Sequence, residues 1–515
     1  MNKKKAAVYD RWLSTLGGGE QVAFAYAEVL RDLGYETHIL THQEIDTQKA
    51  EKKMEVNLKG ISINYLSVMS SYELAEYTEK YDIFINTSYL DYFPNRSKNG
   101  ILSIFFPTPI FLTPYEFAKR AVVLPSFSNF FIYPTIFQGF KFDQFINGKI
   151  YKWMSKSSSI EFNKNITSFS LTLYCKALGI SFVDGVRFFI GDKEVQPIKK
   201  HLLDKDNYVQ YDFELEESAH KKFVVQLPDT SLSDQVALVS FTIHSFRYSL
   251  YNVFKHYFPK WEMRLHGGPG VTKLSDLTSY NHLVTISDFS KLWIKKYWGL
   301  ESEVLYPPVS THNFYVAPKK KNWIIHVGRF FVTGHNKKQL DLVKVFRRLV
   351  DEKGLKDWEL HFVGSIHEGE KHQQYFDQVK YYAQGYPVFF HLDVPFKELR
   401  DSLAQAKIYW HATGLDENED ANPILFEHFG ITTVEAMASG CVPVVIHAGG
   451  QKEIVTKGNG FTWLTRDELL EKTYELTQDK KMLEIYSKNA IERSKFFDRS
   501  QFRKRFETLF LSSEK

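Results

Sequence analysis

The sequence contains little cysteine, no long apolar run and no surplus of charge of either sign. Its 515 residues include only two cysteines, Cys175 and Cys441, which lie far apart, so we expect no disulfide and a reducing compartment. A membrane-spanning helix needs about 18 consecutive apolar residues. The nearest run, residues 101–113, is interrupted by Pro107 and Pro109. These absences predict a cytoplasmic protein.

The charges nearly cancel, with 65 Lys and Arg against 61 Asp and Glu and a formal net charge of +4. Because no strongly basic domain stands out, nucleic acid is not the expected partner. After the basic residues 1–5 comes a very short apolar stretch that ends at Asp10. This pattern predicts a first strand rather than an export signal.

Aromatic residues are abundant, at 16% of the chain with 43 Phe and 29 Tyr. Side chains of this kind fill cores or line surfaces that meet ligands, partners or lipid headgroups. They crowd residues 101–153, where packing of irregular loops is the simplest interpretation. An acceptor groove and peripheral contact with the inner face of a membrane stay open as alternatives.

A chain of this length is too long for one core, so we expect several domains. Residues 1–155 alternate short apolar strands with helical patterns, as in a parallel α/β sheet. Residues 156–262 change to a period of two and predict an all-β, sandwich-like insertion. The first domain resumes at residues 263–312, a second α/β domain follows at 313–485, and residues 486–515 form a C-terminal helix. The insertion could bind glycan, cover an acceptor or join copies into a homo-oligomer.

The most informative motif lies within residues 411–455. Glu427 and Glu435 flank Gly430, where the chain turns and enters an apolar, helix-periodic segment. A helix start presents unpaired N–H groups and a partial positive charge, which suit a diphosphate. A carboxylate can accept hydrogen bonds from two adjacent hydroxyls of a sugar. Together these groups suit a nucleotide-sugar.

This motif resembles the donor-site signature of glycosyltransferase family 4, also called group 1. The resemblance rests on Glu427 and Glu435 with seven residues between them, on EHFGI at residues 427–431 and on GCVPVV at residues 440–445. It implies an α/β GT-B fold, in which two Rossmann-like domains face each other across a cleft. It also implies retention of anomeric configuration and chemistry without a metal.

Two cations of the second domain belong to the same expected site. Arg329 follows the predicted strand 323–327, and Lys337 precedes the predicted helix 339–350. Ligands of open α/β sheets bind beyond the carboxyl ends of strands, where these cations could stabilise a departing diphosphate. They resemble the family's Arg/Lys pair, with Lys337 favoured over its neighbour Lys338.

The first domain offers weaker signals. Gly17, Gly18 and Gly19 follow the first strand and resemble the family's glycine loop, which closes over the donor phosphates. Phe106 stands where many relatives carry a histidine, so we assign no histidine role there. His266 could supply an imidazole, and the DKD triplet at residues 204–206 is interpreted as a turn rather than a metal site.

The resemblance implies transfer of a sugar from a UDP- or GDP-sugar to a glycan or lipid-linked hydroxyl in cell-surface polysaccharide or glycoconjugate synthesis, without a cofactor or metal. Arg329 and Lys337 would stabilise the phosphate, Glu427 would orient the sugar and Glu435 would bind ribose. The backbone N–H groups at the helix start would hold hydroxyls and phosphate; they belong to Phe429, Gly430, Ile431, Thr432 and Thr433. The alternative is a catalytically silent glycan-binding or scaffold protein that uses the β-rich insertion.

Overall fold

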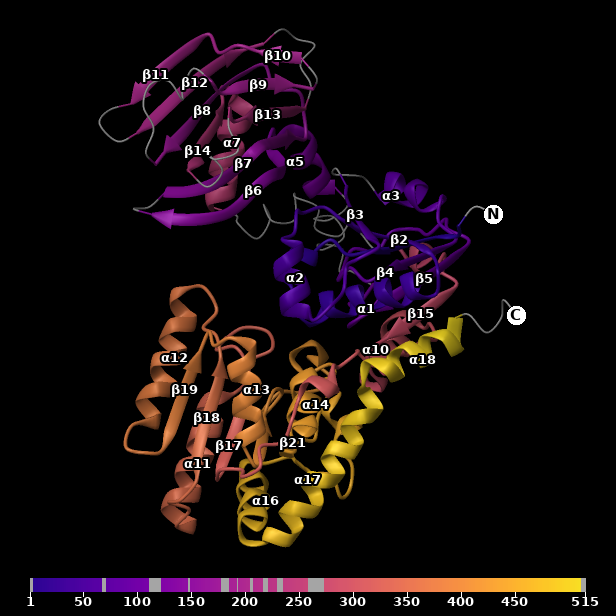
Figure 1. Ribbon diagram of the computed structural model, residues 1–515, viewed down its shortest axis with the longest axis vertical. Helices are drawn as coiled ribbons and strands as arrows, with labels where there is room; N and C mark the ends of the chain where they lie inside the picture. Colours follow the sequence, from indigo (N-terminus) through magenta and orange to yellow (C-terminus); the bar gives the residue numbers. More distant parts are fainter. Residues whose placement is uncertain are drawn as a thin grey trace.

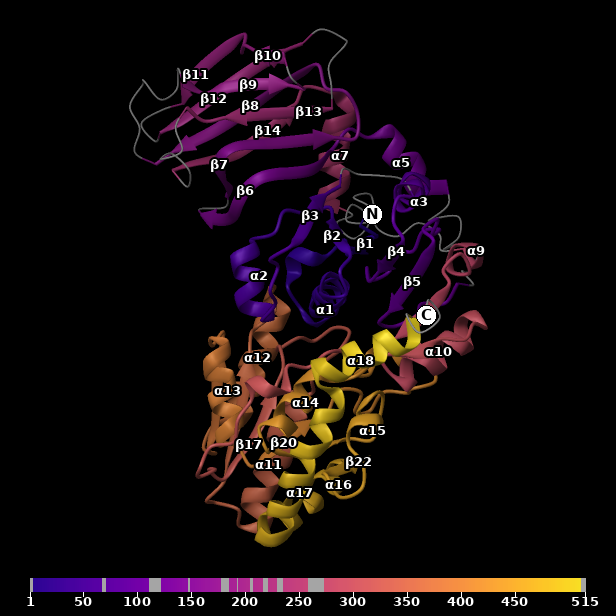
Figure 2. The same cartoon turned by 45° about the vertical axis from the view of Figure 1, so that its right-hand side comes forward.

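The computed structural model describes residues 3–66, 71–110, 122–146, 149–176, 185–191, 193–203, 207–215, 221–228, 235–257 and 273–510. A β-rich block lies at one end, the first α/β domain in the middle and the second α/β domain at the other end (Figure 1). Figure 2 shows the same stacking after a 45° turn.

Within the described residues, the first domain has a seven-stranded parallel sheet in the order β16-β15-β5-β4-β1-β2-β3. Its strands are β1 (Lys5–Tyr9), β2 (Glu36–Thr41), β3 (Ile61–Tyr65), β4 (Ile83–Asn86), β5 (Asn99–Ile104), β15 (His282–Thr285) and β16 (Glu303–Val304). Its helices are α1 (Gly18–Asp32), α2 (Thr47–Met54), α3 (Ser71–Thr78), α9 (Leu274–Leu277) and α10 (Asp288–Trp298). The strand order reverses between β1 and β4, and a crevice for ligands is expected beyond their carboxyl ends.

The second domain has a six-stranded parallel sheet among the residues described, in the order β19-β18-β17-β20-β21-β22. Its strands are β17 (Trp323–Val327), β18 (Glu359–Gly364), β19 (Val388–Leu392), β20 (Ile408–His411), β21 (Val442–Ile446) and β22 (Phe461–Trp463). Its helices are α11 (Gln339–Lys353), α12 (Glu370–Ala383), α13 (Phe396–Gln405), α14 (Ile431–Ala438), α15 (Gln451–Ile454), α16 (Arg466–Gln478) and α17 (Lys480–Ser494). Here the order reverses between β17 and β20. Both domains therefore have the α/β sheets of a GT-B fold.

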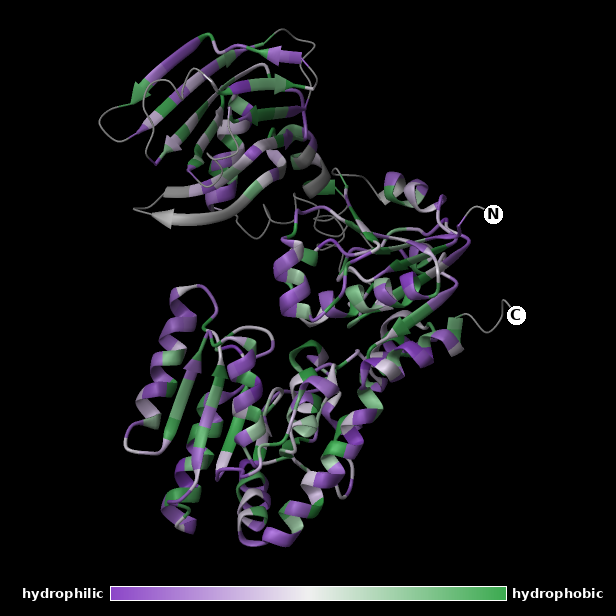
Figure 3. Ribbon diagram, in the orientation of Figure 1, coloured by the Kyte–Doolittle hydropathy of each residue, from purple (hydrophilic) through white to green (hydrophobic). Residues whose placement is uncertain are grey.

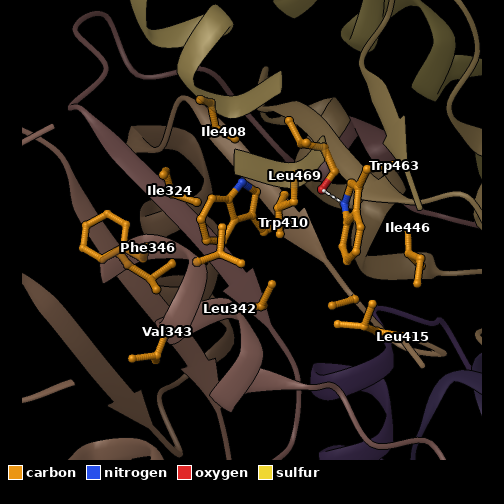
Figure 4. Packing of buried hydrophobic residues seen from close by; sticks show 14 of the residues in the cluster. Ile324, Leu342, Val343, Phe346, Ile408, Trp410, Leu415, Ile446, Trp463 and Leu469 are labelled. Carbon is orange, nitrogen blue, oxygen red and sulfur yellow. Dashed lines mark hydrogen bonds between the residues drawn. The ribbon is translucent and has the colours of Figure 1, made fainter. Parts of the chain in front are cut away.

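The second domain is held by a dense apolar core between its sheet and α11 (Figure 4). Leu342 and Phe346 project from one face of α11 at helical spacing and are fully buried beside Trp410 of β20. The indole of Trp463, also buried, donates a hydrogen bond to the Val444 carbonyl at 3.3 Å. In Figure 3 the strands of this domain are largely hydrophobic, whereas the outer helices carry many hydrophilic residues. The strand ends thus extend from a rigid platform.

The β-rich block is antiparallel. In the part of the chain that is described it contains nine strands, of which eight run in the order β10-β9-β13-β7-β14-β8-β12-β11 and β6 pairs with β7. The strands are β6 (Pro134–Ile146), β7 (Lys149–Phe162), β8 (Ser168–Cys175), β9 (Arg187–Ile190), β10 (Lys193–Val195), β11 (Lys199–Leu203), β12 (Tyr208–Glu214), β13 (Lys222–Gln226) and β14 (Val236–Ile243). Phe188 of β9 and Phe213 of β12 have ring centroids only 5.0 Å apart. Neighbouring strands are about 4.8 Å apart, so two strands this distant in the order can touch only because the sheet folds over itself.

Two predictions for this block are wrong. The antiparallel sheet begins at Pro134 rather than at residue 156, because residues 134–153 form β6 and the start of β7 instead of irregular loops. The block is not all-β, since it also carries α5 (Leu124–Phe130) and α7 (Phe246–Tyr257). Tyr248, Tyr251 and Phe254 recur every three residues along α7 and are buried against the sheet, a helical period that the alternating strands around it obscured.

The end of the chain returns to the first domain. After α17 comes η6 (Lys495–Phe497) and then α18 (Arg499–Phe510), which lies along the first domain in Figures 1 and 2. Phe502 and Phe506 of α18 are buried against Tyr26 of α1, with ring centroids 5.1 and 5.6 Å away. This packing fastens the end of the second domain to the first domain. Among the residues described, no helix is both long and apolar enough to cross a membrane.

Candidate active site

The centre of the candidate site is an ion pair beyond the carboxyl ends of β17 and β20. The Lys337 ammonium lies 2.5 Å from Oε2 of Glu427, and Nε2 of His411 lies 3.2 Å from the same oxygen. His411 is the last residue of β20, and Lys337 lies in the loop between β17 and α11. The site therefore lies at the switch point of the second sheet, where an open α/β sheet binds ligands.

Glu427 is ionised at neutral pH. Burial alone would raise the pKa of its carboxyl, but the Lys337 charge and the His411 hydrogen bond hold that pKa well below its usual value. Its side chain is 20% exposed, so one face remains accessible. Lys338 instead pairs with Glu417 at 2.8 Å. Lys337, and not Lys338, is thus the lysine beside Glu427.

Glycines let the backbone approach this ion pair closely. A β-carbon on Gly328 would lie 2.9 Å from Cγ of Lys337, so only glycine leaves room for the lysine stem. Gly449 has φ +56°, and a β-carbon there would lie 2.3 Å from the Glu427 carbonyl oxygen. The N–H of the next residue, Gly450, donates to that same oxygen at 2.8 Å. This turn fixes the backbone that carries Glu427.

The start of α14 requires glycine at its N-cap. Gly430 has φ +113°, and a β-carbon there would lie 2.0 Å from the amide nitrogen of Gln451. That amide donates to the Phe429 carbonyl at 3.1 Å and accepts from the Thr433 hydroxyl at 2.9 Å. Gln451, which the sequence analysis missed, therefore locks the loop before α14 to its first turn.

The five predicted residues of this helix start differ in what they offer a ligand. Phe429 is a core residue, 2% exposed, and the Thr433 N–H donates to the Gly430 carbonyl at 3.0 Å. The side chain of Thr433 is also buried. Ile431 and Thr432 are the first two helical residues, whose N–H groups have no partner within an α-helix. Of the five predicted residues, Ile431 and Thr432 therefore have the N–H groups that are most accessible to a ligand.

Glu435 lies on α14, one turn after Thr432. Burial, with the nearby Glu55 carboxylate of the first domain, raises the pKa of Glu435 to about 7. Near neutral pH this group is therefore divided between a form that only accepts hydrogen bonds and one that also donates. No sequence pattern pointed to Glu55, which lies 380 positions before Glu435 and comes near it only because the two domains meet.

The glycine loop faces this helix from the first domain. Gly17 is the N-cap of α1, and its N–H donates to the Glu20 carboxylate at 2.6 Å. A β-carbon on Gly18 would lie 3.1 Å from Cδ1 of Ile431, so the loop touches the start of α14. Gly19 packs beside the Phe105 ring, 3.2 Å from where its β-carbon would be. The structure thus brings together the two glycine-containing turns that the sequence singled out.

Arg329 is exposed just beyond β17. Its backbone carbonyl accepts a hydrogen bond from the Gln339 side chain at 3.0 Å. Its guanidinium forms no ion pair with any carboxylate among the residues described. Of the two predicted cations, Lys337 is therefore paired with a carboxylate and Arg329 is not.

Phe106 takes part in a contact between the domains. Its ring stacks on His428 with centroids 4.1 Å apart and planes 8° apart, and Phe289 stacks behind it at 5.6 Å. His335 meets the same His428 ring edge-on at 4.7 Å. Burial lowers the pKa of His428 to about 3, so this imidazole is neutral. At the position where many relatives have a histidine, this chain has Phe106, and its ring stacks on His428 of the second domain.

The acidic segment at residues 416–420 lies beside the loop that carries Glu427. Each of its four carboxylates pairs with a base, in the pairs Asp416–Arg466, Glu417–Lys338, Glu419–Lys452 and Asp420–Lys296. The segment therefore braces one wall of the site. His266 and residues 204–206 lie outside the described residues.

Comparison with known proteins agrees with this architecture. Residues 310–493 match the family model of glycosyl transferases group 1. A Xenopus laevis GDP-Man:Man(3)GlcNAc(2)-PP-Dol alpha-1,2-mannosyltransferase is 26% identical over 192 residues, and a Desulfitobacterium hafniense glycogen synthase is 28% identical over 203 residues. The alignments cover 35% of this chain in each case, and the chain spans only 36% and 41% of the length of these relatives.

Solved structures match over the whole length. A glycosyltransferase from Rickettsia africae superposes with a TM-score of 0.53 and 11% identity, covering 100% of both chains. Anabaena HepE in complex with UDP gives a TM-score of 0.53 and 12% identity, covering 99% of this chain and 100% of HepE. The second domain thus matches the group 1 glycosyl transferase model, and the whole chain shares its fold with solved glycosyltransferases.

Proposed function

We propose that this chain is a retaining, metal-independent glycosyltransferase that moves a sugar from a UDP- or GDP-sugar to a hydroxyl of a glycan or lipid-linked acceptor. The observation that carries this proposal is the Lys337–Glu427 ion pair, 2.5 Å long, at the switch point of the second sheet. The names of the relatives support both nucleotides, since one is a GDP-mannose enzyme and HepE was crystallised with UDP. We place the reaction in the cytoplasm, in the synthesis of cell-surface polysaccharide or glycoconjugate.

The groups of the second domain suit the donor. Glu427, kept ionised by Lys337, would accept hydrogen bonds from sugar hydroxyls and orient the ring. Lys337 and Arg329 would stabilise charge on the departing nucleoside diphosphate. The N–H groups of Ile431 and Thr432 would bind hydroxyl or phosphate oxygens, and Glu435 would bind ribose.

The anomeric configuration is retained because the acceptor hydroxyl attacks the same face of the sugar from which the leaving group departs. The acceptor oxygen bonds to the anomeric carbon as the bond from that carbon to the phosphate oxygen breaks. The acceptor proton passes to the leaving diphosphate, so atoms and charge balance without a protein base. Closure of the glycine loop against α14 would exclude water and so suppress hydrolysis.

A panel of UDP-, GDP- and ADP-sugars in a thermal-shift assay tests the proposal, because a ligand that binds the folded state raises its melting temperature. We expect one nucleotide class to raise the melting temperature of the full chain, and the Lys337→Ala variant to lose that shift. If no nucleotide-sugar shifts the wild-type protein, the catalytically silent glycan-binding or scaffold alternative is favoured.

A further inference from the structure

Two cations without ion-pair partners come from opposite domains. Lys53 lies in the last turn of α2, and Arg329 follows β17. In Figures 1 and 2, α2 lies on the side of the first domain that faces the second domain. The two charges are close enough to affect each other, since the pKa of Lys53 is lowered by burial, by Lys49 and by Arg329, against the opposing effect of Glu20.

Neither cation has an ion-pair partner among the residues described, whereas the neighbouring Lys337 and Lys338 each pair with a glutamate. Glu20 is the only carboxylate that affects the pKa of Lys53, and it already accepts a hydrogen bond from the Gly17 N–H at 2.6 Å. Two like charges therefore lie within electrostatic reach of each other without ion-pair partners in the described part of the chain.

Separate contacts hold the end of α2 against the second domain. Glu55, which ends this helix, accepts a hydrogen bond from the Asn313 amide and lies 3.6 Å from the Arg400 guanidinium. Its backbone carbonyl accepts from Arg499, at the start of α18, at 3.0 Å. The contacts with Asn313 and Arg400 place the end of α2, and with it Lys53, against the second domain. An anion between the two would be attracted by both domains at once.

We propose that Lys53 is the first domain's contact for the diphosphate of the donor, opposite Arg329 on the second domain. This inference rests on the proposed function, because the donor supplies the anion. A diphosphate fits better than a single carboxylate, since it spreads two or more negative charges over several oxygens that separate cations can share. Lys53 would thereby couple donor binding to the closed arrangement of the two domains.

Calorimetric titration of the full chain with inorganic pyrophosphate at low salt tests this contact. We expect Lys53→Gln to weaken binding about ten-fold, the size of effect of one charge-assisted hydrogen bond. Lys52→Gln is the matched control, because Lys52 is exposed on the same turn of α2, and it should bind within about two-fold of wild type. Equal binding by Lys53→Gln and wild type, or an equal loss in both variants, overturns the proposal.

Two further measurements test the role of Lys53. One distinguishes diphosphate binding from a structural role, and the other distinguishes failure of this proposal from failure of the proposed function. Without ligand, Lys53→Gln should melt no lower than wild type, because it removes a repulsion; a lower melting temperature contradicts the proposal. With the nucleotide-sugar found by the panel, KM should rise more than kcat falls. Unchanged KM overturns the role of Lys53 while leaving the glycosyltransferase intact. If wild type binds neither pyrophosphate nor any nucleotide-sugar, both proposals fail.

Discussion

The two faces of the cleft differ in how far their charges are already satisfied. On the second domain, Glu427 is held by Lys337 and His411 over a dense core. Of the two site cations there, Lys337 is paired and Arg329 is not. On the first domain, Lys53 makes no ion pair with any residue described, and the glycine loop presents backbone groups. The Glu427 part of the second face is thus preorganised, whereas Lys53, like Arg329, gains a partner only when an anion binds. Catalytic groups belong on the rigid face, whereas the other face can respond to substrate.

The largest effect on activity should come from removing a charged side chain of the preorganised site on the second domain. Glu427→Ala and Lys337→Ala should each lower kcat by about 10²–10³ or more, because each removes a group aimed at the donor and leaves its partner unpaired. Lys338→Ala, which breaks the neighbouring pair with Glu417, is the control and should keep most activity. Circular dichroism should show folded protein in all three. Near-normal turnover in Glu427→Ala or Lys337→Ala would sink the assignment of this site.

A substitution at Gly430 should strain the backbone of the same site. Gly430→Ala should lower the free energy of unfolding by about 3 kcal/mol, because it adds a clash with Gln451 to the strain of a positive φ. Gly385 has φ +82° with nothing within 4 Å of an added β-carbon, so Gly385→Ala should lose only about 1 kcal/mol from strain. Denaturant unfolding measures both, and equal losses would show that the Gln451 lock contributes nothing.

The contribution of Glu435, which lies near Glu55 of the first domain, to the free energy of unfolding should depend on pH. Its folded pKa of about 7 exceeds the ordinary 4.5, so ionising it in the folded protein is unfavourable. That unfavourable contribution is absent below pH about 4.5 and complete above pH about 7. Glu435→Gln should therefore stabilise the protein by about 2 kcal/mol at pH 8 and little at pH 5. Melting curves at the two pH values check this, and a difference independent of pH would refute it.

The smallest effect is expected where the two domains meet at the surface. Lys296 of the first domain and Asp420 of the second lie 3.0 Å apart, but the aspartate side chain is 87% exposed. Solvent screens such a pair, so Asp420→Asn should change the free energy of unfolding by less than about 0.5 kcal/mol. A larger loss in denaturant unfolding would mean that surface charges, rather than buried packing, hold the domains together.

What could be predicted from the sequence was local or followed a rule of the fold. The strand ends at Arg329 and His411 and the turn at Gly430 lie within recognisable strand and helix patterns, so their shared edge of the sheet followed from topology. The same reasoning placed Lys337 and Glu427 in one site but did not predict their ion pair. The resemblance assigned roles to these residues, and the pairings show how each is held.

What could not be predicted depends on contacts between distant segments. Lys53 and Glu55 lie at the end of a surface helix that carries no recognisable motif. Their place beside the second domain depends on how α2 packs against it. The stack of Phe106 on His428 likewise needs both domains in place. β6 and the start of β7 lie within the aromatic-rich residues 101–153, which were interpreted as irregular loops, so the β-rich block was placed too late.

The decisive experiment measures release of nucleoside diphosphate from the nucleotide-sugar selected by the thermal-shift panel. We expect the wild-type chain to release it and form a new glycosidic bond, Lys337→Ala and Glu427→Ala to release almost none, and Lys338→Ala to resemble wild type. Equal release by wild type and Lys337→Ala, or no release by wild type from a donor that it binds, would refute a catalytic site at the Lys337–Glu427 pair.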